Sequence, residues 1–215
     1  MTPLVVVISS PSGGGKSSIT RRVLSERVDV GYSVSATTRP ARPGEQDGEA
    51  YYFLLPEEFE RRAASGDFLE HATYNGFRYG TLASEVRRVT QGGKHVLLDI
   101  EIEGARQVRQ RFPDALLVFV VPPSGTALVE RLRVRGTESR QVITGRMQRA
   151  LTELSAALEY DYIVVNDDLE GAVRVVNAIL DAEPLRTSRQ RDAAFLLDRI
   201  RHEIAAELTR STDQN

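Results

Sequence analysis

Runs of consecutive apolar, β-branched residues recur along the chain and predict strands buried on both faces of a parallel sheet. The four clearest runs are residues 4–8, 95–100, 115–121 and 162–165, and residues 32–36 predict a fifth core strand. Helical stretches lie between them, and two of these end at recognisable stop signals, at Gly92-Gly93 and before Pro113. Strands that alternate with helices predict an α/β fold with a five-stranded parallel sheet flanked by helices.

Two stretches interrupt this alternation. Residues 37–79 carry short alternating segments around one helix, which starts at Pro56 and stops at Gly66, and they predict a small α+β insertion. Residues 126–159 are helical and rich in Arg, with little apolar periodicity before Met147, and they predict a mobile lid with few buried anchors. We expect a core of residues 4–34, 89–125 and 160–186, an insertion of residues 35–88, a lid of residues 126–159, and a C-terminal helix and tail of residues 187–215.

The last predicted helix covers residues 188–209 and has an apolar stripe on one face. Core packing and a contact with a partner explain this stripe equally well, so the oligomeric state, monomer or homodimer, stays open. The stripe consists of Ala193, Leu197, Ile200, Ile204 and Leu208.

Composition narrows the function classes. The chain has 215 residues and a formal net charge of −2, which argues against a general nucleic-acid binder. It has no Cys and only three His, so thiolate chemistry and a multi-histidine metal centre are not expected. The longest apolar run, residues 115–121, is far shorter than the roughly 20 residues that span a bilayer. With no signal-peptide pattern at its start, the sequence predicts a soluble cytoplasmic protein without a membrane partner.

A glycine-rich segment with one Lys follows the first predicted strand and precedes a helical stretch. Glycines let successive backbone N–H groups point at one phosphate, and the helix N-terminus adds its dipole. The pattern G-x-x-x-x-G-K-[ST] fits except that Ser10 stands at the first Gly, and a glycine-rich surface turn is the alternative. Only two of the 28 basic residues are Lys, and one of them is Lys16. We expect an ATP phosphate loop made of Ser10, Pro11, Ser12, Gly13, Gly14, Gly15, Lys16, Ser17 and Ser18, with Lys16 on the β/γ-phosphates and Ser17 on Mg²⁺.

Further motifs follow in a fixed order. Arg39 and Arg42 lie three residues apart between prolines, a spacing suited to a phosphate monoester. The elements T-T-R-x-x-R-x-G-E, G-x-x-Y-x-F, F-L-E, Y-G-T, L-D-I-E, R-G-T-E and V-N-D-D then occur in turn. With these elements the chain resembles the guanylate kinases, enzymes that phosphorylate GMP with ATP. The resemblance covers about residues 4 to 183.

The resemblance implies a role for each matching residue. For the GMP phosphate it implies Arg39, Arg42, Tyr51 and Tyr79, with Glu45 orienting the arginines. For guanine it implies Glu70 as acceptor from N1–H and the exocyclic amine, Ser35 and Thr81 as donors to O6, and Glu101 where the family often has Asp. For Mg²⁺ it implies Asp99 through water, together with Ser17, and it places Asp99 among the residues that bind GMP as well. For the ATP phosphates and the adenine end it implies Arg131, Arg135 and Arg146 of the lid, and Asn166.

Simpler interpretations remain beside these. Glu70 could be an ordinary strand carboxylate, Asp99 could cap the next helix, and either Tyr51 or Tyr52 packs in the core. His71 and His95 are expected to be structural, and Arg133 and Arg149 to lie on a solvated face. At the level of the protein, the alternatives are a non-catalytic guanylate-kinase-like binding module and a P-loop kinase of another phosphorylated acceptor.

Overall fold

The computed structural model describes residues 2–134, 140–190 and 192–212. Its central sheet has five strands, all parallel, in the order β2-β7-β1-β8-β9. The strands are β1 (Val5–Ser9), β2 (Val30–Tyr32), β7 (His95–Asp99), β8 (Leu116–Val121) and β9 (Tyr162–Val165). Helices α1 (Lys16–Glu26), α3 (Ala83–Gln91) and α4 (Ile102–Arg111) pack against it. The apolar runs in β1, β7 and β8 are buried for this reason, and the predicted α/β core is confirmed.

The fifth core strand lies two residues earlier than predicted. Val30–Tyr32 joins the central sheet as β2, whereas Ser35–Thr37 forms β3 in a second sheet. Gly31 lies inside β2, although glycine is unfavourable in a strand. The side chain of Val89 occupies the space beside it. A Cβ atom at Gly31 would lie 2.6 Å from Cγ1 of Val89.

The second sheet belongs to a small lobe inserted between β2 and α3. Its strands β3, β4 (Tyr52–Phe53), β5 (Phe68–Tyr74) and β6 (Phe77–Leu82) have the order β4-β3-β6-β5. Helix α2 (Pro56–Ala64) buries Phe59, whose ring stacks on that of Phe68 with 4.4 Å between centroids. The lobe is tied to the core at β5, an edge strand. There the side-chain amide of Gln107 on α4 accepts a hydrogen bond from the backbone N–H of His71 and donates one to its carbonyl.

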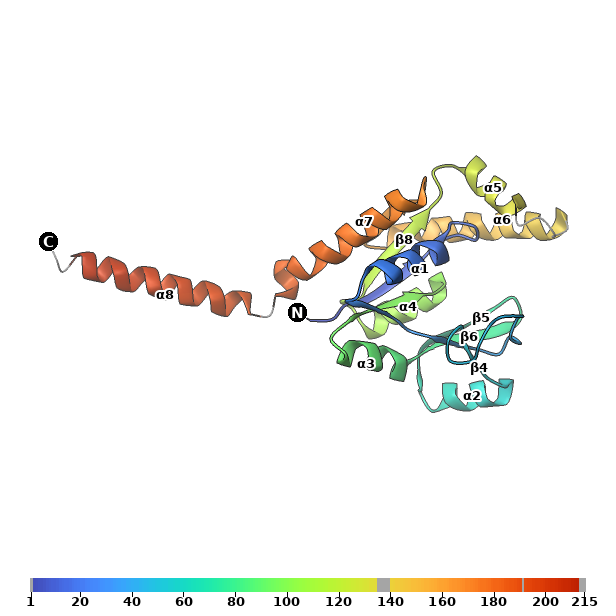
Figure 1. Ribbon diagram of the computed structural model, residues 1–215, viewed down its shortest axis with the longest axis horizontal. Helices are drawn as coiled ribbons and strands as arrows, with labels where there is room; N and C mark the ends of the chain where they lie inside the picture. Colours follow the sequence, from blue (N-terminus) through green and yellow to red (C-terminus); the bar gives the residue numbers. More distant parts are fainter. Residues whose placement is uncertain (1, 135–139, 191, 213–215) are drawn as a thin grey trace. The chain divides into compact units, whose positions relative to one another are not determined.

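Helices α5 (Gly125–Val134) and α6 (Arg140–Ser155), with a 3-10 turn at Ala156–Glu159, form the segment expected to be a lid. Two buried anchors lie before Met147, and the mobility of this segment stays a prediction. Leu128 and Leu132 of α5 are buried with Ala150 of α6, and Met147 packs against this cluster. Figure 1 shows α5 and α6 and the inserted lobe at the same end of the central sheet, on opposite sides of it.

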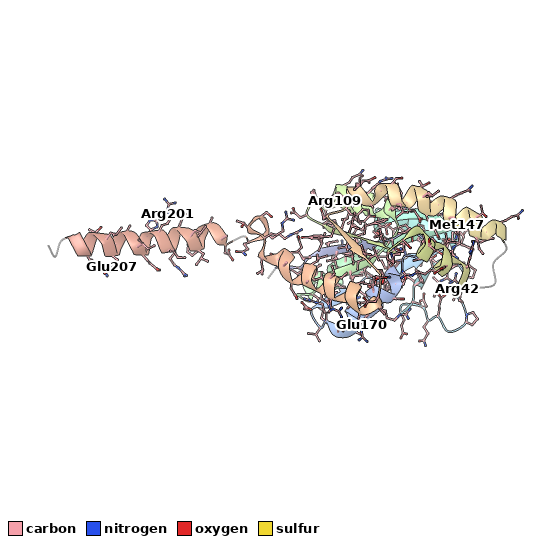
Figure 2. All side chains as sticks on the ribbon, turned by 90° about the horizontal axis from the view of Figure 1, so that it is seen from above. Arg42, Arg109, Met147, Glu170, Arg201 and Glu207 are labelled. Carbon is pink, nitrogen blue, oxygen red and sulfur yellow. The ribbon has the colours of Figure 1, made fainter. Side chains whose placement is uncertain are left out.

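Residues 178–215 form a second compact unit, which begins within α7 (Leu169–Ala182). After 3-10 turns at Glu183–Leu185 and Thr187–Arg189, helix α8 covers Ala193–Thr212. It begins later than the predicted residue 188 because the chain first makes the second of these turns. The apolar stripe is exposed at Leu197, Ile200, Ile204 and Leu208, and Figure 2 shows Arg201 and Glu207 projecting from opposite sides of α8. Within the described ranges, no helix is both long and apolar enough to cross a membrane.

Candidate active site

The loop between β1 and α1 has the backbone of a phosphate cradle. Gly13 and Gly15 adopt φ angles of 88° and 95°, in the left-handed region that favours glycine. Helix α1 begins at Lys16, directly after Gly15, so that its N-terminus faces the loop. Such a loop presents consecutive backbone N–H groups to one anion. A cavity of about 200 Å³ lies over this segment, lined by eight of the nine residues expected to form the phosphate loop, all except Gly14.

Ser10 fits at the first position of the loop although the general motif has Gly there. The residue is buried, and its hydroxyl donates to the carbonyl oxygen of Pro11 at 3.1 Å. Gly14 makes the room, because a Cβ atom there would lie 2.8 Å from Cβ of Ser10. The departure from the motif is therefore accommodated inside the loop.

Asn166, at the end of β9, holds the loop from the other side. Its amide donates to the carbonyl oxygen of Gly14 at 2.9 Å, and a Cβ atom at Gly15 would lie 2.3 Å from its Nδ2. Asn166 also lines a cavity of about 550 Å³ that runs from Gly13 and Gly15 to Arg131. The direct contact of Asn166 is with the phosphate loop, and a place at the adenine end of ATP stays a prediction.

Lys16 extends from the start of α1 to the carboxyl end of β7. Its Nζ atom lies 3.1 Å from Oδ1 of Asp99 and 2.7 Å from Oε1 of Glu101. Burial disfavours the ammonium charge, but the two carboxylates outweigh it and raise the pKa of Lys16. The longer side chain at residue 101 thus reaches Lys16, and a contact of Glu101 with the base stays a prediction.

A third cavity, of about 490 Å³, lies between the phosphate loop, the inserted lobe and α4, and is called the lobe cavity below. Lys16 and Ser17 line it at one end, and Gly104 lines it at the base of α4. Six of the residues expected to bind GMP also line it: Ser35, Tyr51, Glu70, Tyr79, Asp99 and Glu101. The topology therefore brings these six residues, from β3, β5, β6, β7 and the loops before β4 and after β7, around one space next to Lys16.

Glu70 on β5 is the buried acid of this cavity, with 4% of its surface exposed. Burial raises the pKa of its carboxyl group to about 7, although hydrogen bonds from Thr81 work against the rise. The hydroxyl of Thr81 donates to Oε1 of Glu70 at 2.6 Å. This differs from the expected role of Thr81 as a donor to O6, because its one hydroxyl proton is directed to Glu70.

The expected phosphate clamp is only partly assembled. Arg39 is buried, its Nη2 atom lies 2.9 Å from Oε1 of Glu45, and its guanidinium lies 5.3 Å from the ring centre of Tyr51. Arg42 is exposed, and its backbone N–H, not its guanidinium, donates to Glu45. Arg42 lies in the loop between β3 and β4 and is labelled in Figure 2. The sequence did not decide whether Tyr51 or Tyr52 packs in the core. Tyr51 lines the cavity, whereas Tyr52 donates its hydroxyl to Oε1 of Glu85.

Of the two helices expected to be a lid, α6 contacts the phosphate loop directly, and α5 contacts Asn166 beside it. The guanidinium of Arg146 donates to the hydroxyl of Ser12 from Nε at 3.1 Å and from Nη2 at 3.0 Å. Arg131 donates from Nη2 to the carbonyl oxygen of Asn166 at 2.8 Å. Arg135, the third expected arginine, lies outside the described residues. Arg146 therefore bonds the loop itself, whereas Arg131 bonds Asn166, which in turn holds the loop.

Sequence reasoning missed two residues of α6. Glu153 is buried, and its Oε2 accepts a hydrogen bond from the backbone N–H of Ser12 at 2.9 Å. Arg149 is exposed, as expected, but it also lines the lobe cavity, bonds Oδ1 of Asn75 at 3.0 Å and lies 4.9 Å from the ring centre of Tyr74. Arg149 and Glu153 follow Arg146 by three and seven residues, so all three lie on one face of the helix. This spacing is the pattern from which the two residues could have been predicted.

The oxygen atoms near Lys16 fit Mg²⁺ that arrives with a nucleotide. Ser17 and Asp99 both line the lobe cavity. In the part of the chain that the structure describes, no group of three or more His, Cys, Asp or Glu side chains is placed to hold a metal ion. Mg²⁺ bound to phosphates keeps several waters and needs one or two protein ligands, so this sparse set is sufficient.

A parallel sheet with a phosphate loop after its central strand, a following helix and a Lys at the loop's end defines a P-loop nucleotide-binding protein. The guanylate kinase family model matches residues 2–183. The chain belongs to the guanylate kinase family.

Individual relatives agree with this family. A guanylate kinase from Symbiobacterium thermophilum is 50% identical over 186 residues, which cover 86% of this chain and 88% of that protein. A guanylate kinase from Desulfitobacterium hafniense is 48% identical over 187 residues, covering 87% and 94%. The crystal structure of guanylate kinase from Anaplasma phagocytophilum is similar with a TM-score of 0.76 at 33% identity, covering 92% of this chain and 94% of that one.

Proposed function

We propose that this chain transfers the γ-phosphoryl group of ATP to GMP and releases ADP and GDP. One observation carries the proposal. The cavity that Lys16 lines at the end of the phosphate loop is also lined by Glu70, a buried carboxylate on the lobe. A carboxylate accepts hydrogen bonds from N1–H and the exocyclic amine of guanine, whereas adenine offers no donor at N1.

The two nucleotides are assigned to the two sides of Lys16. ATP is assigned to the phosphate loop and to the cavity lined by Arg131 and Asn166. The GMP phosphate is assigned to Arg39, Tyr51 and Tyr79, with Arg42 turning in from its exposed loop when the anion binds. Glu45 supports this role of Arg39, because it already holds the guanidinium through two oxygens at 2.9 Å.

Phosphoryl transfer then needs positioning and positive charge more than covalent chemistry. Lys16, Arg131 and Arg146 are proposed to neutralise the charge that develops on the transferred group, and Arg135 is assigned the same role from its motif. Ser17 and Asp99, the latter through water, are proposed to hold Mg²⁺, which supplies further neutralising charge on the ATP phosphates. The helices α5 and α6 over the phosphate loop are proposed to exclude water that would otherwise hydrolyse ATP.

A coupled assay for ADP formation tests the proposal. Purified protein is mixed with ATP and Mg²⁺ and with each of GMP, AMP, UMP and CMP, and a parallel series contains EDTA. We expect turnover with GMP only, and none with EDTA. Turnover with another acceptor would overturn the assignment of Glu70 to guanine. Binding of GMP without turnover would instead support a binding module that has kept the fold.

A further inference from the structure

Gly104 lies at the third position of helix α4, directly against the carboxylate of Glu70. A Cβ atom built at Gly104 would lie 2.4 Å from Oε2 and 2.9 Å from Cδ of Glu70. Gly is less favourable than Ala inside a helix, so its presence in α4 needs another reason. The space that a methyl group would fill is occupied by this carboxylate.

The present position of the Glu70 carboxylate is set by its neighbours. Its Oε1 atom is held by the hydroxyl of Thr81 at 2.6 Å, and the residue is buried. The next residue of β5, His71, is joined to Gln107 of the same helix α4 through both backbone groups, at 3.1 and 3.0 Å. Strand and helix therefore cannot separate to admit a side chain at position 104 without breaking these bonds.

The conflict is confined to one group. The third atom nearest to the added Cβ is Cδ1 of Ile100, at 3.4 Å, which is ordinary van der Waals contact. Both atoms nearer than 3.0 Å belong to the carboxyl end of Glu70. A methyl group at this position would therefore push the carboxylate and leave the helix and strand backbones in place.

We propose that Gly104 is a positioning residue for base selection, since its missing side chain leaves room for Oε2 of Glu70 at the wall of the lobe cavity. Gly104 and Glu70 line the same cavity, so the displaced carboxylate would move within the space that the base needs. This inference rests on the proposed function, because it takes guanine as the occupant of the cavity. The residue acts through Glu70 and touches no reacting atom.

The test compares Gly104→Ala with a matched control, Gly125→Ala. Gly125 is the first residue of α5, also near a helix N-terminus, and a Cβ atom there meets nothing within 4 Å. Steady-state kinetics are measured for GMP and for ATP. We expect the KM for GMP to rise about tenfold or more in Gly104→Ala, the range for a misplaced hydrogen bond to a charged group, with the KM for ATP within about twofold. Gly125→Ala is expected to match the wild type.

A double-mutant cycle separates positioning from general packing. On a Glu70→Ala background, Gly104→Ala is expected to cause no further change in the KM for GMP. An equal penalty on both backgrounds would overturn the inference, and so would an unchanged KM for GMP in the single variant. If Gly104→Ala unfolds the protein, Glu70→Ala must restore the fold, because it removes the two nearest atoms. Failure of the wild type itself to phosphorylate GMP would overturn the proposed function instead.

Discussion

The ammonium group of Lys16 lies 2.7 Å from a carboxylate oxygen of Glu101, so the cation of the phosphate loop is neutralised by the chain itself. Asp99 adds a second carboxylate at 3.1 Å. The incoming phosphates must therefore compete with two acidic side chains for one Lys. Binding of ATP is expected to rearrange this cluster before the reaction.

The first prediction concerns Lys16. Lys16→Ala is expected to lower kcat by about 100-fold or more, the usual result of removing one preorganised group that stabilises the transition state. Steady-state ADP formation measures the loss, and circular dichroism checks that the fold is kept. Lys94→Ala, the change of the other Lys of the chain, is the matched control. A rate close to that of the wild type would exclude the phosphate-loop role.

The second prediction concerns pH. Glu70 accepts hydrogen bonds from guanine only when it is ionised, and its pKa of about 7 in the free protein places the change near neutrality. The kcat/KM for GMP is therefore expected to fall about tenfold from pH 8 to pH 6. Glu70→Gln serves as the control, because any fall that remains in this variant comes from the phosphate of GMP. Identical profiles in both proteins would contradict the role of Glu70.

The third prediction concerns stability. Because burial raises the pKa of Glu70, the folded state binds its proton more tightly than the unfolded state does. The free energy of unfolding thus decreases as pH rises from about 4.5 to 7 and stays lower above that. Glu70→Gln removes the ionised group and is expected to stabilise the fold at pH 8 by about 1–3 kcal/mol. Denaturant unfolding at pH 8 and pH 4.5 measures the difference, which should vanish at the lower pH.

The fourth prediction concerns the contact between α6 and the lobe. Arg149 stacks on Tyr74 and bonds Asn75 at the lobe cavity, but the contact is exposed. Arg149→Ala is expected to raise the KM for GMP by about two- to fivefold, in line with about 0.5–1 kcal/mol for such contacts. Arg133→Ala removes an exposed Arg of α5 and is the matched control. If both variants behave alike, Arg149 has no part in closing the cavity.

The fifth prediction concerns Glu153. Its carboxylate accepts the backbone N–H of Ser12, one of the groups that a phosphate loop offers to its anion. Burial raises the pKa of Glu153, and Glu101 adds to the rise. Glu153→Gln removes the competing charge and is expected to tighten ATP binding by about two- to tenfold, as for one hydrogen bond to a charged group. Titration with ATP measures the change in affinity, and Glu203→Gln on α8 is the control. Weaker binding in Glu153→Gln would contradict the prediction and show that Glu153 supports the loop.

Local patterns were sufficient for the core and for the phosphate loop. The run after Leu4, the glycines and Lys16 are contiguous, so strand, loop and helix can be predicted together. Prediction failed where distant residues decide the structure. The strand β2 was placed two residues too late because it contains Gly31, which is there to make room for the distant Val89. The burial of Leu128 and Leu132 was not predicted because they lie in an Arg-rich segment.

The site shows the same division. Glu70, Asp99 and Tyr51 follow from motifs, and the structure brings them to one cavity. The roles of Thr81, Gly104 and Glu153 depend on contacts between residues 11, 34 and 141 positions apart, which no local pattern contains. For Arg42 the motif is clear in the sequence, but its side chain is exposed in the structure.

The pairing of Gln107 with His71 also bears on how the chain behaves among other molecules. An edge strand with free backbone groups is a template on which strands of neighbouring chains can add. At β5 the amide of Gln107 occupies both outward backbone groups of His71, and α4 lies along the strand. The helix that carries Gly104 therefore also protects this side of the lobe's sheet against intermolecular β-pairing and aggregation.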